Sequence, residues 1–142
     1  MAALVLCACG GKPSTMDDLT SVEVTLPNGV KIRAQAMRQA SDLARGMMYQ
    51  ESLAPDRGML FFHQREVAAT YNMFQVKIPL DLIFLDHDRR IMAIAKDAQP
   101  CRAKLTEQCP VYGTRAPSLF VLETNAGFAA RNGLKVGDRL EF

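Results

Sequence analysis

Two acidic residues stand out because each lies within a predicted strand. Asp81 follows Pro79-Leu80 and opens an apolar run, and Glu123 lies near the end of a second one. A carboxylate beside a buried strand must be paired or reach water, because burying a lone charge is costly. We therefore predict that Arg45, whose guanidinium suits a partly buried bidentate contact, pairs with Asp81. A salt bridge that fixes a helix to the sheet is favoured over a polar anchor in a cleft.

The same two carboxylates offer a catalytic alternative. Glycoside hydrolysis uses two acidic side chains that flank the bond to be broken. Asp81 and Glu123 both lie on predicted strands, where they can face one another. Because any β protein offers such pairs, we assign no catalytic residue and keep Asp81 with Glu123 as the alternative.

Aromatic and methionine side chains are frequent in the central part of the chain. Most of them should fill the core, where methionine adapts to irregular gaps. Ligand pockets are also mainly apolar, with a few polar groups. We assign Phe61 and Phe84 to the core. The predicted ligand-binding residues are Arg45, Tyr71, Phe74 and Asp81.

Cys101 and Cys109 lie in a loop that Pro100 and Pro110 delimit. The spacing is not that of a Cys-x-x-Cys redox motif, and no second Cys or His pair lies nearby in the sequence. A structural disulfide between these two residues is therefore favoured over a dithiol redox site or half of a zinc site.

Metal and cofactor chemistry is weakly supported. Asp86, His87 and Asp88 could ligate a metal, but turns are naturally rich in Asp. The second histidine, His63, is in no zinc-binding pattern. We predict no metal site and no cofactor.

The N-terminus is typical of an export signal. Residues 1–8 are apolar and too short to span a bilayer, and Leu6-Cys7-Ala8-Cys9 resembles a bacterial lipoprotein box. We interpret residues 1–8 as the remnant of a signal peptide and 9–20 as a tether with Cys9 lipidated. The protein is then exported and held by its lipid on the periplasmic side of the cell envelope.

The composition describes one ordinary globular domain, which we place at residues 21–142. The 142 residues are 49% hydrophobic and 23% charged, and the net charge is +2. This balance argues against a nucleic-acid partner, for which a clustered basic excess is usual.

Short alternating segments must position these residues. Asn28-Gly29 between two such segments predicts a hairpin. Turn signals recur often without a βαβ rhythm, which predicts a mostly β (α+β) fold, an antiparallel sandwich or distorted barrel with two short helices. We expect strands at 21–26, 30–36, 59–62, within 67–76, at 80–85, 91–95, 119–124 and near 142. We expect helices at 41–48 and 126–132, and coil from the cysteine loop to Pro117.

Five motifs in fixed order carry a family resemblance. They are Arg45-Gly46-Met47-Met48, 58–62 (GMLFF), 78–86 (IPLDLIFLD), Val121-Leu122-Glu123 with Ala126-Gly127, and Gly137-Asp138. The chain resembles the domain of unknown function 192 family from Val22 onward. The resemblance implies a compact β-rich sandwich or distorted barrel, and no established activity.

One segment departs from the family pattern. Members usually have an aromatic-Trp-Met-Lys-Asn-Thr run before Ile-Pro-Leu-Asp, whereas this chain has YNMFQV at 71–76. Tyr71 and Met73 keep the aromatic and the Met, and the other four residues differ. If this run lines a site, the site here has a more apolar chemistry.

Two functions from different classes follow from these residues. The first is a lipid-anchored, non-enzymatic module that binds a small ligand, a glycan or an envelope protein. The second is a hydrolase that acts on an envelope polymer through Asp81 and Glu123. Because no catalytic motif is present, we favour binding over catalysis.

Overall fold

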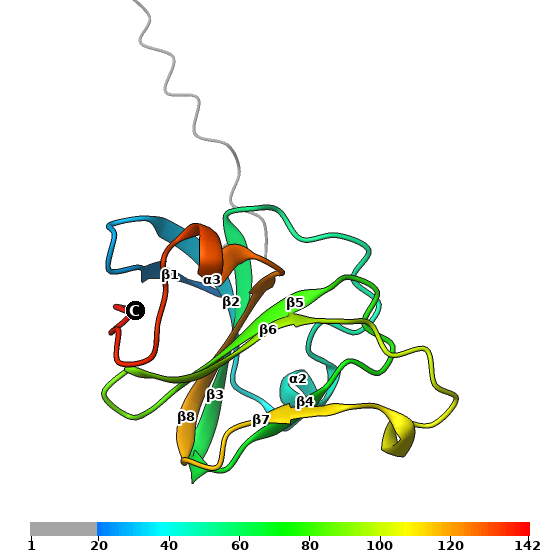
Figure 1. The fold of residues 1–142 in the computed structure, drawn as a ribbon. Helices are drawn as coiled ribbons and strands as arrows, with labels where there is room; N and C mark the ends of the chain where they lie inside the picture. Colours follow the sequence, from blue (N-terminus) through cyan, green and yellow to red (C-terminus); the bar gives the residue numbers. More distant parts are fainter. Residues whose placement is uncertain (1–19) are drawn as a thin grey trace, which may run out of the picture.

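The computed structural model describes residues 20–142. The predicted signal-peptide remnant, the lipidated Cys9 and the rest of the tether before residue 20 lie outside the described residues. Six strands form one sheet in the order β1-β2-β3-β8-β5-β6, and a second sheet pairs β4 with β7 (Figure 1). The strands are β1 Ser21–Thr25, β2 Lys31–Met37, β3 Arg57–Val67, β4 Thr70–Asn72, β5 Leu80–Leu85, β6 Ile91–Ala98, β7 Val111–Gly113 and β8 Ser118–Asn125; the helices are α2 Ala40–Arg45, the 3-10 turn η1 Thr106–Gln108 and α3 Phe128–Arg131.

The hairpin predicted at Asn28-Gly29 is confirmed, and the structure contains a second antiparallel pair of consecutive strands. β1 and β2 are antiparallel across the Asn28-Gly29 turn, where Gly29 has φ 85°. This left-handed backbone is easy for glycine, which has no Cβ. β5 and β6 form the second antiparallel pair. The mostly β fold with two short helices is confirmed as well.

The sheet is mixed and not wholly antiparallel. β2 and β3 run parallel, with Ala34 opposite Gly58. A parallel pair requires a crossover connection, and the segment that contains α2 provides it. This crossover carries α2 over one face of the sheet, where it becomes a wall of the site described below.

Both faces of the sheet are buried, because apolar side chains on its central strands point alternately to one side and the other. All six residues of β5 are buried. Ile83 and Leu85 belong to one hydrophobic cluster, and Leu82 and Phe84 belong to a second. The sheet therefore needs cover on both sides.

The first face is covered by α3 and the C-terminal segment, from which Phe128, Ala129 and Leu140 enter the core. Glu141 bridges to Thr25 on β1, and Arg139 bridges to Arg90 next to β6. These bridges join the two edge strands and partly close the sheet at one end, as in a distorted barrel.

The second face is covered by α2 and the β4–β7 ribbon, which lie on the side of the sheet opposite α3 (Figure 1). The strand predicted within 67–76 is β4, which covers residues 70–72. The predicted coil around the cysteines contains η1 and β7, both unforeseen. Cys101 and Cys109 form the predicted disulfide. No helix in the described part of the chain is long and apolar enough to cross a membrane.

Candidate functional site

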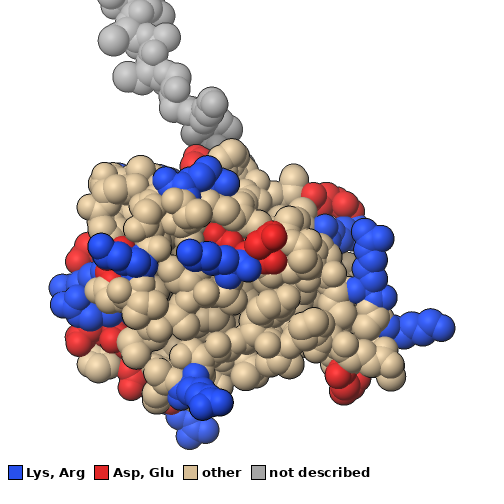
Figure 2. All heavy atoms as spheres, in the orientation of Figure 1, with Lys and Arg blue, Asp and Glu red and all other residues tan. Residues whose placement is uncertain are grey.

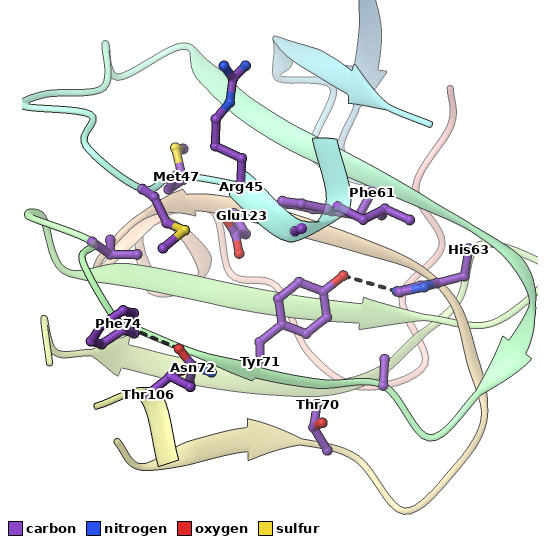
Figure 3. A pocket seen from close by; sticks show the side chains of 16 residues that line it. Arg45, Met47, Phe61, His63, Thr70, Tyr71, Asn72, Phe74, Thr106 and Glu123 are labelled. Atoms are coloured by element: carbon purple, nitrogen blue, oxygen red, sulfur yellow. Dashed lines mark hydrogen bonds between the residues drawn. The ribbon is translucent and has the colours of Figure 1, made fainter. Parts of the chain in front are cut away.

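A cavity of about 270 Å³ lies on the second face, between the sheet, α2 and the β4–β7 ribbon (Figure 3). This volume is several times the roughly 30 Å³ that one water occupies in the liquid. It is lined by Leu43, Ala44, Arg45, Gly46, Met47, Met48, Phe61, His63, Ala69, Thr70, Tyr71, Asn72, Phe74, Val76, Thr106 and Glu123.

Glu123 lies at the sheet side of this cavity, on the central strand β8. It is opposite Met59 of β3 and Leu82 of β5, so its side chain points to the second face. The residue is only 6% exposed, and its Oε2 atom has no hydrogen-bond partner within residues 20–142. Burial raises the pKa of this carboxyl group to about 8. A group held this way is a candidate for function, since buried polar atoms are nearly always paired.

The buried Thr124 Oγ1 also lacks a partner among the described residues. Thr124 is opposite Asp81, so it points to the first face, away from the cavity. A neutral hydroxyl is also far less costly to bury than a carboxylate. Glu123 is therefore the unpaired group that bears on the site.

Gly46 allows α2 to approach this carboxyl group closely. It ends the helix with φ 46°, a left-handed backbone that favours glycine. A Cβ at this position would lie 3.2 Å from Cζ of Phe61 and 3.9 Å from Oε2 of Glu123. A side chain here would reduce the cavity beside Glu123.

Tyr71 of β4 crosses the cavity opposite Glu123. Its ring packs edge-on against Phe61 and Phe84, at centroid distances of 5.4 and 6.0 Å. Its hydroxyl group lies 3.0 Å from Nε2 of His63. Burial, followed by the charge of Glu123, raises the pKa of Tyr71, and burial lowers the pKa of His63. Both groups are therefore held in their neutral forms near neutral pH.

Phe74, Thr106 and Arg45 complete the walls of the cavity. The disulfide loop positions the first two, because Phe74 bridges to Cys101 and Thr106 lies inside the loop. The guanidinium group of Arg45 points away from Glu123 and Tyr71 (Figure 3). Arg45 therefore lines the cavity with its stem more than with its charge.

Asp81 is not part of this cavity, and the predicted pair with Arg45 is wrong. Asp81 is 1% exposed and accepts hydrogen bonds from backbone N–H groups of Asp97, Gly127 and Ala129 at 2.9, 3.2 and 2.9 Å. Three donors satisfy the carboxylate without a cation. The residue joins β6 to the start of α3, which is a structural role.

The structure also separates the two carboxylates proposed as a catalytic pair. Asp81 is opposite Thr124, and Leu82 is opposite Glu123. Side chains alternate along a strand, so Asp81 and Glu123 point to opposite faces of the sheet. They cannot flank one bond, and the predicted hydrolase site is wrong.

The turn after β5 is held by its own side chains. Asp86 accepts hydrogen bonds from the backbone of Asp88 and Arg90, and His87 contacts Glu66. Within residues 20–142, no group of three or more His, Cys, Asp or Glu side chains could hold a metal ion.

Of the predicted ligand-binding residues, the structure brings Arg45, Tyr71 and Phe74 to one cavity and leaves Asp81 out. Sequence reasoning missed His63, Asn72 and Thr106. The divergent run at 71–76 was the signal that could have indicated Asn72. Nothing in the sequence pointed to Thr106, because its loop folds back through the disulfide.

The comparisons with known proteins agree with this fold. A family model for DUF192, described as "Uncharacterized ACR", matches residues 23–142. A protein of unknown function from Novosphingobium aromaticivorans has a similar structure, with TM-score 0.74 and 35% identity over 86% of this chain and 85% of that one. A proposed transcription regulator from Sinorhizobium meliloti has TM-score 0.75 and 31% identity over 85% of this chain and 91% of that one. Among curated proteins no match to this chain is found.

Proposed function

This chain belongs to the domain of unknown function 192 family, and we propose that it is a non-enzymatic binding module whose cavity around Glu123 takes a small ligand. The observation that carries the proposal is the unpartnered Oε2 atom of a buried carboxyl group inside a cavity. A few polar groups in a largely apolar concavity is the usual composition of a ligand site.

The energetic cost of burying an unpaired carboxyl group supports a functional role for Glu123. A buried carboxyl group without partners lowers stability, and an apolar residue of similar size at such a position is often more stable. Asp81 shows that this fold can satisfy a buried carboxylate fully. A ligand that donates to Glu123 would supply the partner that the protein does not.

Binding is favoured over catalysis because, among the described residues, one carboxyl group lines the cavity and no serine or cysteine does. General acid–base hydrolysis of a glycosidic bond needs a second carboxylate, and Asp81 is on the other face. The hydrogen bond of His63 goes to Tyr71 and not to a serine or cysteine.

The cellular setting is the second part of the proposal. The lipoprotein-like box at Cys9 supports a lipid anchor and a position on the periplasmic side of the envelope, and the disulfide suits that compartment. Residues 10–20 could span at most ~40 Å, enough to hold the domain near a membrane.

The surface charge supports a partner other than nucleic acid. Lys and Arg groups alternate with Asp and Glu groups on the face shown in Figure 2, and the net charge is +2. Nucleic-acid sites concentrate basic side chains. A small ligand, a glycan or an envelope protein fits this surface better.

Heteronuclear NMR with a panel of small molecules tests the binding proposal. The panel should contain cationic, anionic and neutral compounds, including envelope glycan fragments. We expect shifts that cluster at Gly46, Tyr71 and Glu123, that disappear in Glu123→Gln and that persist in Glu23→Gln, an exposed carboxylate on β1. Silence at the cavity across the panel would refute the proposal.

Fractionation of bacterial cells tests the anchor. The wild-type chain should sediment with membranes, and Cys9→Ser should move to the soluble fraction. Cys7→Ser is the matched control and should behave as the wild type. If Cys9→Ser and the wild type divide equally between the membrane and soluble fractions, the lipoprotein assignment is wrong.

A further inference from the structure

We infer that the ligand of this cavity carries an organic ammonium group, which sits against Glu123 and between the aromatic rings of Phe61, Tyr71 and Phe74. The inference rests on the proposed binding function and names its ligand class. It follows from three features of the cavity: its charge, its unpartnered acceptor and its aromatic walls.

The charge of the cavity favours a cation. Glu123 is the one acidic residue that lines it in the described part of the chain. The other ionisable groups that face it are Tyr71 from β4, His63 from β3 and Arg45 from α2. Tyr71 and His63 are neutral, and the charge of Arg45 points outward (Figure 3). An anionic ligand would meet a carboxyl group with no internal cation to offset it.

The unpartnered acceptor indicates a positively charged group more than a hydroxyl. An ionised carboxylate only accepts hydrogen bonds, and Oε2 of Glu123 has none. A neutral hydroxyl gives one hydrogen bond but does not compensate the buried negative charge once Glu123 is ionised. An ammonium group compensates that charge directly. A protonated amine also donates a charge-assisted hydrogen bond to Oε2, whereas a quaternary ammonium ion, which has no N–H group, acts through its charge alone.

The walls suit the same group. The aromatic side chains Phe61, Tyr71 and Phe74 line the cavity together with the thioethers of Met47 and Met48. A cation near the face of an aromatic ring is attracted by the ring quadrupole, and aromatic enclosures are a common way to bind quaternary ammonium ligands. The methyl groups of such a ligand would also contact the methionines.

The titration of Glu123 gives the binding a pH signature. Burial raises the pKa of Glu123 to about 8 in the free protein, so a cation must displace its proton below that pH. The affinity for a quaternary ammonium ion, which does not titrate, should rise about tenfold per pH unit up to about pH 8 and then level off. His63, with its pKa lowered by burial, and Tyr71, with its pKa raised by burial, both stay neutral between pH 7 and pH 9, so Glu123 is the group that changes.

The test compares choline with its neutral isostere, 3,3-dimethylbutanol, by NMR titration of the full 142-residue chain at pH 6, 7, 8 and 9. We expect choline to bind at least about tenfold more tightly than the alcohol at pH 8, because the two compounds differ only in the positive charge that Glu123 and the aromatic rings attract. Glu123→Gln should lose that preference and the pH dependence, and Glu23→Gln should keep both. Glycerophosphocholine as a third ligand separates the sources: equal binding indicates a lipid headgroup, weaker binding a free amine, and either supports the inference.

The outcomes separate this inference from the binding function. If a neutral or anionic compound occupies the cavity and choline does not, the ammonium inference is overturned and the binding function stands. If nothing occupies the cavity, both are overturned. If Glu123→Gln does not fold, the wild-type pH profile decides alone, because a choline affinity that is flat or falls with rising pH overturns the inference.

Discussion

Each face of the six-stranded sheet contains one buried carboxyl group, and the surroundings of the two groups differ sharply. On the face covered by α3, Asp81 accepts three backbone hydrogen bonds. On the face with the cavity, Glu123 has an Oε2 atom without a partner. The two residues lie on neighbouring strands and are similarly buried, so burial alone does not explain the difference.

The difference indicates what each face does. A carboxylate with three donors stabilises the structure, since it joins two elements that would otherwise end in unpaired N–H groups. A carboxyl group with an unpartnered oxygen beside a cavity lowers the stability of the protein, and that oxygen is available to a ligand. Substitutions at the two positions should therefore have opposite effects on stability.

The largest expected effect is that of Asp81→Ala. It leaves three backbone N–H groups at Asp97, Gly127 and Ala129 without their acceptor. Each buried orphan donor costs about 1–3 kcal/mol, so we expect a loss of about 4 kcal/mol in the free energy of unfolding. Urea denaturation followed by circular dichroism measures it.

The matched control for Asp81 is Asp86→Ala. Asp86 accepts two solvent-exposed backbone hydrogen bonds in the turn after β5. Water can replace that acceptor, so the loss should be about 1 kcal/mol. Equal losses at the two positions would show that Asp81 does not hold the first face together.

The second prediction is that Glu123→Gln stabilises the protein. The folded pKa of Glu123 is about 8, above the reference value of 4.5, so the folded state binds more protons between these values. The stability of the wild type then falls as the pH rises from about 4.5 to 8. The glutamine variant lacks this loss. Its free energy of unfolding should exceed that of the wild type by about 3 kcal/mol at pH 7 and by almost nothing at pH 4.5.

Denaturation curves of the wild type and Glu123→Gln at several pH values measure this gain. His63, whose pKa is lowered by burial, titrates in both proteins, so its contribution cancels in the difference. If the free energies of unfolding of the two proteins change with pH in parallel, Glu123 is not a buried, unpaired carboxyl group. A variant that gains stability and loses ligand binding is what a functional residue predicts.

The sequence predicted the parts of the fold whose determinants are local. Asn28-Gly29 specified the first hairpin, and the apolar run at 80–85 matches β5 residue for residue. Strands β4 and β7 were not predicted as a pair, because each has three residues and they lie far apart along the chain. The parallel β2–β3 pair was missed because the helix in its crossover, α2, has only six residues, too few to show a clear helical periodicity in the sequence.

The site was predicted in part for a related reason. Tyr71 and Phe74 could be named because they lie in the segment that differs from the family pattern. The roles of Asp81 and Glu123 could not be told apart, because they depend on the β5–β8 register, which pairs Asp81 with Thr124. The donors to Asp81 are backbone N–H groups, and these leave no mark in a sequence.

The third prediction concerns the disulfide that supports the cavity wall. Cys101→Ser with Cys109→Ser opens a short loop, and the chain-entropy model gives a loss of about 2.5 kcal/mol. Because the loop positions Phe74 and Thr106, ligand binding at the cavity should weaken as well. Denaturation and NMR titration measure the two effects. Unchanged binding would show that the cavity is shaped by the sheet and α2 alone.

The smallest effect is expected for Tyr71→Phe, which keeps the ring and removes the hydroxyl group 3.0 Å from Nε2 of His63. The free energy of unfolding should fall by about 1 kcal/mol, as for the loss of one hydrogen bond. Choline binding should be kept, because the aromatic ring remains. Tyr112→Phe, on the partner strand β7, is the control, since the hydroxyl group of Tyr112 makes no hydrogen bond among the described residues and its removal should lower the stability less. If Tyr71→Phe costs as much as Asp81→Ala, the cavity face is held by a polar network like the first face. Glu123 would then belong to that network and would not be a ligand group. The stability of a face that is open to a ligand should not depend so strongly on one hydroxyl group.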